Sequence, residues 1–490
     1  MKDFLLEHAD KDPVSFHMPG HKGADFFRKY GYGEFLDRFV DCDVTEIRGA
    51  DNLFQAEGII KDVMDRYAAL YDVKNSYLLI NGSSAGLIAS VMASVRPGGK
   101  LIMARNCHKS VFNALSLAGV DPVYAHPEFL DEYGISGAVT VEEIDRCMDE
   151  HPDADAVILP SPNYYGICSD IEAIAKAVHA RDKVLIVDQA HGAHLKFFHT
   201  FGFGEGMPKS AEESGADLVI GSIHKTLASL TQSAILNHNT DRVSKYVLED
   251  KLQMIESTSP SYILMSFLDI NAEILEKYGE DAIGEWRKNL DEFYEELRQI
   301  PGLKIMDVAD DGGTAGVMDR TKVNLDMGAY GIDGATLEQE LQKYNIFPEL
   351  YAGNVLMLMT GIGNTKKHFD RTIAALKDIA WQHAADYSEE RYTDVTNGDA
   401  PDGASGGAAV RKAPAAGALH PIPQHKEMVL LTESAGRICA SSIIPYPPGI
   451  PLVCPGEEIT EEVISYVKAL REEGESVMGI TDRGDVVVGV

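Results

Sequence analysis

The sequence predicts an α/β protein with a large domain on a mainly parallel sheet, a smaller α+β domain and a small C-terminal α+β domain. Short apolar runs alternate with helical patterns between residues 57 and 236. These runs are apolar at every position, which is typical of parallel strands covered by helices on both faces. The pattern changes near residue 290, and again after a stretch rich in Gly, Ala and Pro at 396–418.

Each expected element of the large domain has a simple sequence signature. Apolar residues recur at helical spacing from Ile60 to Tyr71. Buried strands are expected over the short apolar runs that follow, each of which precedes a helical stretch: 77–80, 101–103, 156–159, 184–187 and 218–220. This order predicts strands whose carboxyl ends share one edge of a sheet.

Five segments follow along the chain. We expect an N-terminal arm at 1–56, a large domain at 57–290, a small α+β domain at 291–385, a flexible linker at 386–425 and a C-terminal domain at 426–490. Later elements are expected as strands at 303–308, 323–327, 355–359 and 485–490, and as a helix at 337–344. The linker has no periodic apolar face that could offset its ordering entropy.

Composition excludes several classes of function. The 490 residues include 44 Lys and Arg against 76 Asp and Glu, a formal charge of −32. Nucleic acids and anionic membranes are poor partners for such a chain, because both bind mainly through cationic side chains. The first residues lack the pattern of a secretory signal. The six cysteines form no CxxC pair, which fits a cytoplasmic protein with reduced thiols.

Four polar sites follow the predicted strands, where ligands of open parallel sheets bind. The first runs from Gly82 to Gly86 and includes Ser83 and Ser84, small residues that could cradle an anion at a helix start. Ser and Gly also cap many helices without a ligand. The second contains His108, which either stacks on a ligand ring or starts a helix with a backbone partner.

The third and fourth sites follow the strands at 184–187 and 218–220. Asp188 ends a strand of Val and Ile, so its carboxylate needs a cationic or donor partner. His191 and His194 follow, but without an HExxH or Cys pattern we expect no metal. Lys225 is a candidate imine-forming amine, although a lysine in an exposed polar turn gives the same local pattern.

Together these four sites indicate pyridoxal phosphate. The phosphate needs donors, the ring needs a stacking partner, the pyridine nitrogen needs a carboxylate and the aldehyde needs a lysine. The sequence offers them in order as the serines near residue 83, His108, Asp188 and Lys225.

Several longer motifs then carry a resemblance to a known family. They are His17-Met18-Pro19-Gly20-His21-Lys22-Gly23, Asp188-Gln189-Ala190-His191-Gly192, Ser222-Ile223-His224-Lys225, Pro445-Tyr446-Pro447-Pro448-Gly449-Ile450-Pro451 and Pro455-Gly456-Glu457. With them the sequence resembles the Orn/Lys/Arg decarboxylases of pyridoxal-phosphate fold type I, the aspartate-aminotransferase-like fold. It is most similar to the shorter bacterial biosynthetic arginine decarboxylase type.

The resemblance implies a role for each site residue. Lys225 would bind the cofactor aldehyde, Asp188 would pair with the pyridinium and His108 would stack on the ring. The remaining residues would bind phosphate (Ser83, Ser84 and Ser222), lie near the substrate carboxylate (His224) and shape the pocket (Ala190 and His191). The catalytic set is therefore Lys225, His224, Asp188 and His108. Family members build their sites between subunits, which implies a homodimer or higher homo-oligomer, with 257–262 near its interface.

The implied reaction is α-decarboxylation of a basic amino acid to the corresponding amine and carbon dioxide, in polyamine biosynthesis. Arginine is the first choice of substrate, followed by lysine or ornithine. One alternative is another fold type I activity, an aminotransferase or a β-lyase. An alternative of a different class is a catalytically silent homologue that acts as a binding partner.

Overall fold

The computed structural model describes residues 1–306, 317–388, 417–420, 422–446, 450–472, 474 and 476–490. In these residues the largest sheet has seven strands in the order β2-β10-β9-β8-β7-β3-β4. The strands are β2 (Asn75–Leu79), β3 (Lys100–Ala104), β4 (Asp121–Ala125), β7 (Ala154–Pro160), β8 (Val184–Asp188), β9 (Leu218–Gly221) and β10 (Ala234–His238). Only β10 runs antiparallel to its neighbours, so the predicted mainly parallel sheet is confirmed.

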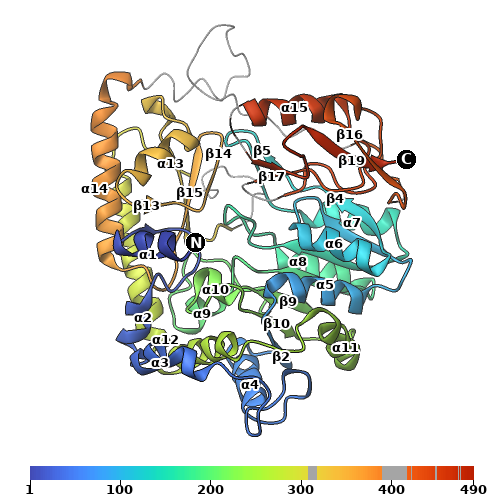
Figure 1. The fold of residues 1–490 in the computed structure, drawn as a ribbon, viewed down its shortest axis with the longest axis horizontal. Helices are drawn as coiled ribbons and strands as arrows, with labels where there is room; N and C mark the ends of the chain where they lie inside the picture. Colours follow the sequence, from blue (N-terminus) through green and yellow to red (C-terminus); the bar gives the residue numbers. More distant parts are fainter. Residues whose placement is uncertain (307–316, 389–416, 421, 447–449, 473, 475) are drawn as a thin grey trace.

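The helices pack on both faces of this sheet (Figure 1). They are α4 (Ile59–Tyr71), α5 (Gly82–Ser94), α6 (Lys109–Ala118), α7 (Val141–Glu150), α8 (Ile171–Ala180), α9 (Leu195–Thr200), α10 (Ile223–Thr226), α11 (Lys245–Ile255) and α12 (Tyr262–Leu297). The strand side chains between them are almost completely buried, from Leu101 in β3 to Ile220 in β9. This two-sided burial explains why each predicted strand is apolar at every position.

Two strands of the large sheet escaped the sequence prediction. Strand β4 begins with Asp121-Pro122 at the edge of the sheet, where a proline is tolerated because no further strand needs its N–H. Strand β10 contains Asn237, whose buried amide bonds to Ser76 and Glu212. Polar side chains hid both strands from a search for apolar runs.

The small domain contains a four-stranded antiparallel sheet in the order β11-β12-β15-β14. Its strands and helices are β11 (Lys304–Ile305), β12 (Lys322–Asp326), α13 (Gly334–Gln342), β14 (Leu350–Ala352), β15 (Val355–Met359) and α14 (Lys366–Gln382). The proposed boundary at 290 falls within α12, which runs beside α14 (Figure 1). The end of the strand expected at 303–308 lies outside the described residues.

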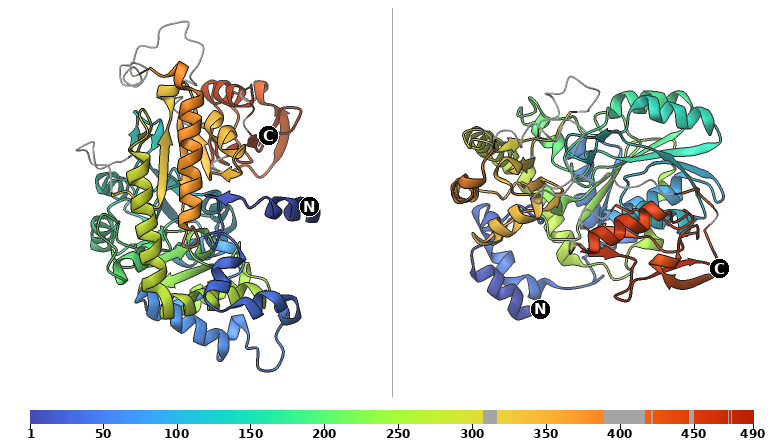
Figure 2. Two further views of the ribbon diagram at one scale, coloured as in Figure 1. Left: turned by 90° about the vertical axis from the view of Figure 1, so that its left-hand side faces the viewer. Right: turned by 90° about the horizontal axis from the view of Figure 1, so that it is seen from above.

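The N-terminal arm contacts the small domain, and one short strand pairing is part of that contact. Strand β1 (Val14–Ser15) runs parallel to β13 (Ile346–Phe347). Helix α1 (Lys2–Asp10) has no buried residue and extends away from the body of the molecule (Figure 2). Helices α2 (Ala24–Lys29) and α3 (Gly33–Arg38) follow in the arm. A separate small hairpin, between β4 and α7 in the chain, pairs β5 (Phe129–Leu130) with β6 (Ile135–Ser136).

The C-terminal segment has its own core. It consists of β16 (Lys426–Leu430) paired with β19 (Asp485–Gly489), β17 (Ile444–Tyr446) paired with β18 (Ser476–Met478), and helix α15 (Glu461–Glu472). Val463, Val467 and Val486 are among its buried residues. Most of the linker predicted at 386–425 lies outside the described residues. No described helix combines the length and apolarity needed to cross a bilayer.

Arg105 fastens the C-terminal segment to the large sheet. Its guanidinium donates to the carbonyls of Pro451 (2.7 Å) and Leu452 (3.0 Å) and to Glu457 Oε2 (2.9 Å). The Glu457 side chain is 2% exposed, so the ion pair is shielded from water. A buried pair of this kind is costly to break, because the remaining charge loses its partner.

We expect Glu457→Ala to destabilise the C-terminal segment by about 3 kcal/mol, because it leaves the Arg105 guanidinium buried without a carboxylate. Hydrogen exchange of the α15 and β19 amides measures the effect. Glu427→Ala is the control, since the Glu427–Arg437 pair is exposed to solvent and should change protection by less than about 0.5 kcal/mol. Equal losses in both variants would contradict the role given to the Arg105 pair.

Candidate active site

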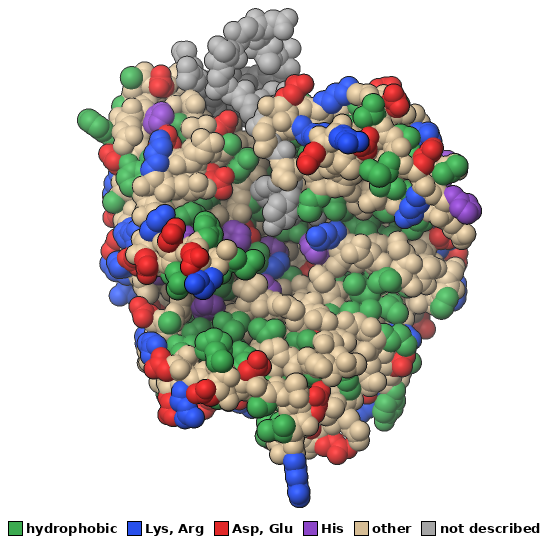
Figure 3. Space-filling model, viewed as in Figure 1, with side chains coloured by type: hydrophobic (Ala, Val, Ile, Leu, Met, Phe, Trp, Pro, Cys, Tyr) green, Lys and Arg blue, Asp and Glu red, His purple; other side chains and the backbone are tan. Residues whose placement is uncertain are grey.

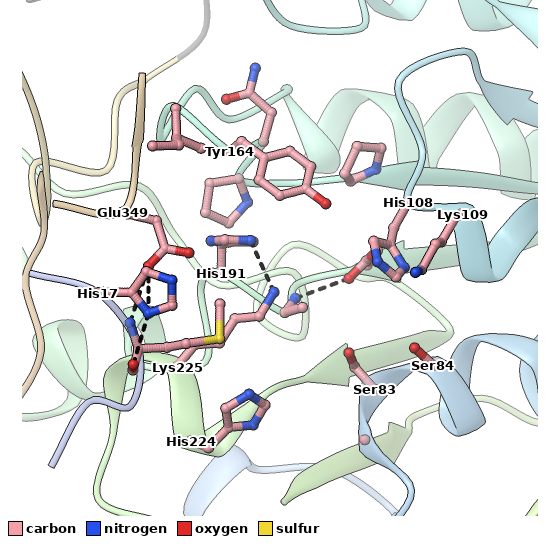
Figure 4. A pocket seen from close by; sticks show the side chains of 18 of the residues that line it. His17, Ser83, Ser84, His108, Lys109, Tyr164, His191, His224, Lys225 and Glu349 are labelled. Atoms are coloured by element: carbon pink, nitrogen blue, oxygen red, sulfur yellow. Dashed lines mark hydrogen bonds and ion pairs between the residues drawn. The ribbon is translucent and has the colours of Figure 1, made fainter. Parts of the chain in front are cut away.

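A cavity of about 350 Å³ lies at the carboxyl ends of the parallel strands. Its wall combines the large domain with His17 and Met18 of the arm, Glu349 and Leu350 of the small domain, and Met478 of the C-terminal segment. Figure 3 shows the corresponding hollow in the middle of this face, with histidine side chains gathered around it. In Figure 4, His191 and Lys225 point toward one another, with His108, Ser83 and Ser84 across the cavity.

Lys225 lies on the short helix α10, directly after β9. Its Nζ is 3.0 Å from Nε2 of His191 and faces the cavity. Burial lowers the pKa of Lys225 below its ordinary value. The positive charge of Lys322 also lowers this pKa, whereas the negative charges of Asp188 and Glu349 raise it. A lowered pKa increases the fraction of neutral amine, which is the nucleophilic form.

Asp188 is the last residue of β8 and lines the same cavity. Its Oδ1 accepts a hydrogen bond from the Ala190 N–H (3.1 Å). Burial raises the pKa of this carboxyl, and the charge of Lys225 opposes the rise. A cation that pairs with Asp188 in the cavity would compensate its desolvation.

His108 starts a helix with a backbone partner, which is one of the two roles considered for it, and its position also leaves the stacking role open to it. It is the N-cap of α6, where Nδ1 accepts from the Ser110 N–H (3.3 Å), and its ring also lines the cavity. Burial lowers the pKa of His108 to about 3, with further contributions from Lys225 and Lys109. The imidazole is therefore neutral, as suits a ring that stacks on a ligand.

The residues of the predicted anion cradle lie at the start of α5. Gly82 has a φ of 76°, which lets the chain turn sharply from β2 into the helix, and Ser83 and Ser84 line the cavity. Ser222, the third serine predicted to bind the phosphate, is not among the residues that line the cavity. It lies fully buried before α10, and its Oγ has no hydrogen-bond partner among the described residues.

The remaining predicted residues surround Lys225. Ala190, His191 and His224 all line the cavity. The His224 Nδ1–H donates to the Ser233 carbonyl (2.9 Å), and burial lowers the pKa of His224 to about 4. His191 and His194 do not converge, because His194 faces Thr226 and Asp319 instead. In the described part of the chain, no group of three His, Cys, Asp or Glu side chains could hold a metal ion.

Sequence reasoning missed Glu349, which joins the wall from the loop between β13 and β14. Its Oε2 accepts from the Met18 N–H (3.1 Å) and lies 3.8 Å from Nδ1 of His17. No local signal could have found Glu349, because the position of its loop depends on how the small domain packs. His17 and Met18 belong to the motif at 17–23. That motif contributes to the family resemblance, but the sequence assigns its residues no function.

That motif has a structural explanation around Gly20. The Gly20 N–H donates to the His224 carbonyl (2.7 Å), and the Gly20 carbonyl accepts from the Gly363 N–H (3.0 Å). A Cβ on Gly20 would lie 2.5 Å from the carbonyl carbon of Thr226, closer than packed atoms can approach. Glycine therefore lets the arm pass directly against the backbone that carries Lys225.

Pyridoxal phosphate fits the residues present. The cradle at 82–84 and the partnerless Ser222 hydroxyl are donors suited to a phosphate. Asp188 can pair with a protonated ring nitrogen, the neutral His108 can stack on the ring, and Lys225 supplies the amine.

Comparison with known proteins agrees with this geometry. The family model for the major domain of Orn/Lys/Arg decarboxylases matches residues 1–312, and the model for their C-terminal domain matches residues 407–483. The chain belongs to the Orn/Lys/Arg decarboxylase family. Its class of activity is therefore the pyridoxal-phosphate-dependent decarboxylation of a basic amino acid, and the predicted family and enzyme class are confirmed.

Individual relatives cover nearly the whole chain. The arginine decarboxylase of Bacillus subtilis (strain 168) is 35% identical over 490 residues, covering 98% of this chain and 94% of that protein. The arginine decarboxylase of Halalkalibacterium halodurans is 32% identical, with coverage of 98% and 94%. Among solved structures, lysine decarboxylase A from Pseudomonas aeruginosa has a TM-score of 0.74 at 21% identity, covering 99% of this chain and 80% of that one. This similarity confirms fold type I.

A buried carboxyl lies beneath the phosphate cradle of this family member. Glu256 Oε2 accepts from the Asn81 N–H (3.0 Å), and the Asn81 side chain donates to the Ile255 carbonyl (3.0 Å). Burial raises the pKa of Glu256 from 4.5 to about 7, with hydrogen bonds from Asn81 and Ile80 opposing the rise.

Glu256 should make the cofactor-free protein less stable as the pH rises. The unfolded chain releases this proton near pH 4.5 and the folded protein only near pH 7. Stability should fall by about 3 kcal/mol as the pH rises through that window. Glu256→Gln should remove this fall, because an amide oxygen can still accept from Asn81.

Unfolding midpoints at a pH below and a pH above the window measure the effect. Asp250→Asn on the exposed side of α11, the helix that ends directly before Glu256, should retain the wild-type pH dependence. A Glu256→Gln variant that loses stability as steeply as wild type would contradict the role of Glu256.

Proposed function

We propose that the protein decarboxylates arginine to the corresponding amine, with pyridoxal phosphate bound to Lys225, as a step toward polyamines. The observation that carries this proposal is the placement of Lys225, Asp188 and a second carboxylate, Glu349, in one cavity. Arginine is preferred to lysine because the relatives named arginine decarboxylase are 31–35% identical, whereas those named lysine decarboxylase are 23–24% identical.

Each site residue has a defined task in this reaction. Once bound, the cofactor supplies an electron sink for the electron pair of the breaking bond between Cα and the carboxylate. Ser83 and Ser84 would hold its phosphate together with the buried, partnerless Ser222 hydroxyl, and the Asp188 carboxylate would keep the ring nitrogen protonated. Pro160, Pro162 and Tyr164 line the cavity as largely apolar surfaces that limit the access of water.

Lys225 is better placed than His224 to return a proton to Cα. The His224 Nδ1–H is committed to the Ser233 carbonyl, and the low pKa leaves its other ring nitrogen without a proton. The Lys225 amine faces the cavity, and during the reaction it would be the group that carries the proton to Cα.

Glu349 is suited to bind the cationic end of the substrate. Asp188 and Glu349 are the two carboxylates in the described cavity wall, and Asp188 is reserved for the ring nitrogen. One Glu349 oxygen already accepts from the Met18 N–H. A guanidinium offers several donors in a plane and can bond to such a carboxylate at more than one point.

The aminotransferase alternative needs an arginine for the substrate α-carboxylate. Arg320 and Arg371, the two small-domain candidates, lie outside the described cavity wall. The Arg320 guanidinium stacks on the Tyr294 ring at 4.6 Å, and Arg371 donates to the carbonyls of Asp12 and Tyr344. Both arginines are thus engaged in packing, which favours decarboxylation.

We also propose a cytoplasmic homodimer or higher homo-oligomer. Val40, Ile47 and Ile59 expose 71%, 58% and 55% of their surface near the start of the large domain, and a second copy could cover them. All six cysteines are free thiols, as is usual in a reducing compartment. Sedimentation equilibrium tests the assembly.

Lys225→Ala should lose carbon dioxide release from arginine by several orders of magnitude, because the amine that binds the cofactor and moves the proton is gone. The visible absorbance that cofactor gives the wild-type protein should also disappear. Keto-acid formation is measured in parallel, since its presence without carbon dioxide would support an aminotransferase. Wild-type protein without absorbance or product after cofactor addition would instead support a silent binding protein.

Glu349→Gln should raise the KM for arginine by about 10- to 100-fold with a smaller change in kcat, because a charge-assisted hydrogen bond to the substrate is lost. Steady-state kinetics with arginine, lysine and ornithine measure the effect. Glu338→Gln, which changes a partly buried small-domain carboxylate outside the cavity wall, is the matched control. An unchanged KM for all three substrates would exclude Glu349 from substrate binding.

A further inference from the structure

Three fully buried side chains, Asp319, Lys322 and His194, form a cluster behind the cavity that the proposed reaction does not use. The Lys322 Nζ donates to Asp319 Oδ2 (2.8 Å) and to Thr321 Oγ1 (3.3 Å). A buried ion pair seldom adds much stability over an apolar core, because both charges lose their hydration. The position of the pair relative to Lys225 suggests another purpose.

The first connection runs from Lys322 to the tip of the Lys225 side chain. Besides its bond to Asp319, the Lys322 Nζ donates to the backbone carbonyl of His191 (2.5 Å). The ring of that same residue lies with Nε2 3.0 Å from the Lys225 Nζ. Lys322 thus holds the backbone of His191, and the side chain of His191 contacts the reactive amine of Lys225.

The second connection runs from Asp319 to the backbone beside Lys225. His194 Nε2 lies 3.2 Å from Asp319 Oδ1, and His194 Nδ1 lies 3.0 Å from Thr226 Oγ1. A carboxylate only accepts hydrogen bonds, so Nε2 carries the proton and Nδ1 accepts from the Thr226 hydroxyl. Thr226 follows Lys225 directly, so this connection ends at the base of the lysine.

We propose that the Asp319–Lys322 pair positions Lys225, holding its tip through His191 and its base through His194 and Thr226. The inference rests on the proposed function of Lys225 as the cofactor-binding amine. Asp319 and Lys322 belong to the small domain, whereas Lys225, His191 and His194 belong to the large one. The pair therefore ties the orientation of the amine to the packing of the two domains.

The pair also supplies charge near Lys225. The titratable groups that face Lys225 from the surrounding elements are Asp188, His191, Lys322, Glu349, His108 and His224. Among them Lys322 is the other lysine, and its ammonium opposes protonation of Lys225. Removing it leaves less positive potential at Lys225, whether Asp319 then stays ionised or takes up a proton.

The test replaces Lys322 with methionine, which keeps the length of the side chain and removes the ammonium. In the cofactor-free protein, competitive acetylation followed by peptide mass spectrometry gives the pH midpoint of Lys225 reactivity. Lys322→Met should raise this midpoint by about one pH unit. In the cofactor-loaded enzyme, kcat should fall by about 10- to 100-fold with little change in KM, because a misplaced amine slows proton transfer.

Two further variants separate positioning from general destabilisation. The double variant Asp319→Asn/Lys322→Met removes both charges. It should fold even if Lys322→Met does not, because it leaves no unpaired Asp319 carboxylate. It should raise the pH midpoint of Lys225 reactivity in the same direction. Asp326→Asn is the control at the far end of β12, where the carboxylate accepts from the Gly328 N–H (2.6 Å) and lies outside the cavity wall. It should leave the midpoint and kcat unchanged even where it lowers stability.

A Lys322→Met or double variant whose midpoint and kcat match those of Asp326→Asn would overturn the inference. Because the acetylation midpoint is read without cofactor or substrate, it tests the inference even if the wild-type protein decarboxylates none of the three amino acids. That last result would overturn the proposed function alone.

Discussion

The structure depends on holding one lysine amine in a cavity that is shielded from water. Exposure to water therefore does not stabilise the charge of that amine. The charges that act on Lys225 come from two carboxylates, Asp188 and Glu349, and from a second buried lysine, Lys322. Burial and Lys322 both favour the neutral amine, while the carboxylates favour the ammonium. A reactive lysine needs this balance, because a fully protonated amine is not a nucleophile and a fully neutral one has no proton to return.

Three distant segments of the chain meet to maintain that balance. The Gly20 N–H bonds to the His224 carbonyl, the Ile362 N–H bonds to the Thr226 carbonyl, and the Gly363 N–H bonds to the Gly20 carbonyl. These bonds bracket Lys225 between the N-terminal arm and the small domain. Side chains larger than hydrogen would separate the backbones at Gly20 and Gly363, where an added Cβ would lie 2.5 Å and 2.1 Å from neighbouring carbonyl atoms.

The sequence was sufficient for the parts of the site that lie at strand ends. Asp188, His108 and Lys225 each follow an apolar strand, and parallel strands place their carboxyl ends together, so their meeting could be predicted. Glu349 and Lys322 could not, because they reach the site through the packing of a second domain and no local pattern encodes that packing. The strands β4 and β10 were missed for a different reason. Strand β4 begins with Asp121-Pro122 at the sheet edge, and β10 contains the polar Asn237, whose buried amide bonds to Ser76 and Glu212.

The loop after β3 links the third part of the molecule to this site. Arg105, which holds the C-terminal segment through Glu457, lies three residues before His108, which faces the cavity. The segment held in this way contributes Met478 to the cavity wall. Because one short loop carries both the docking arginine and the stacking histidine, displacement of the C-terminal segment would remove part of the wall and release the loop together. The C-terminal segment is therefore a structural component of the active site, although its own residues carry none of the proposed chemistry.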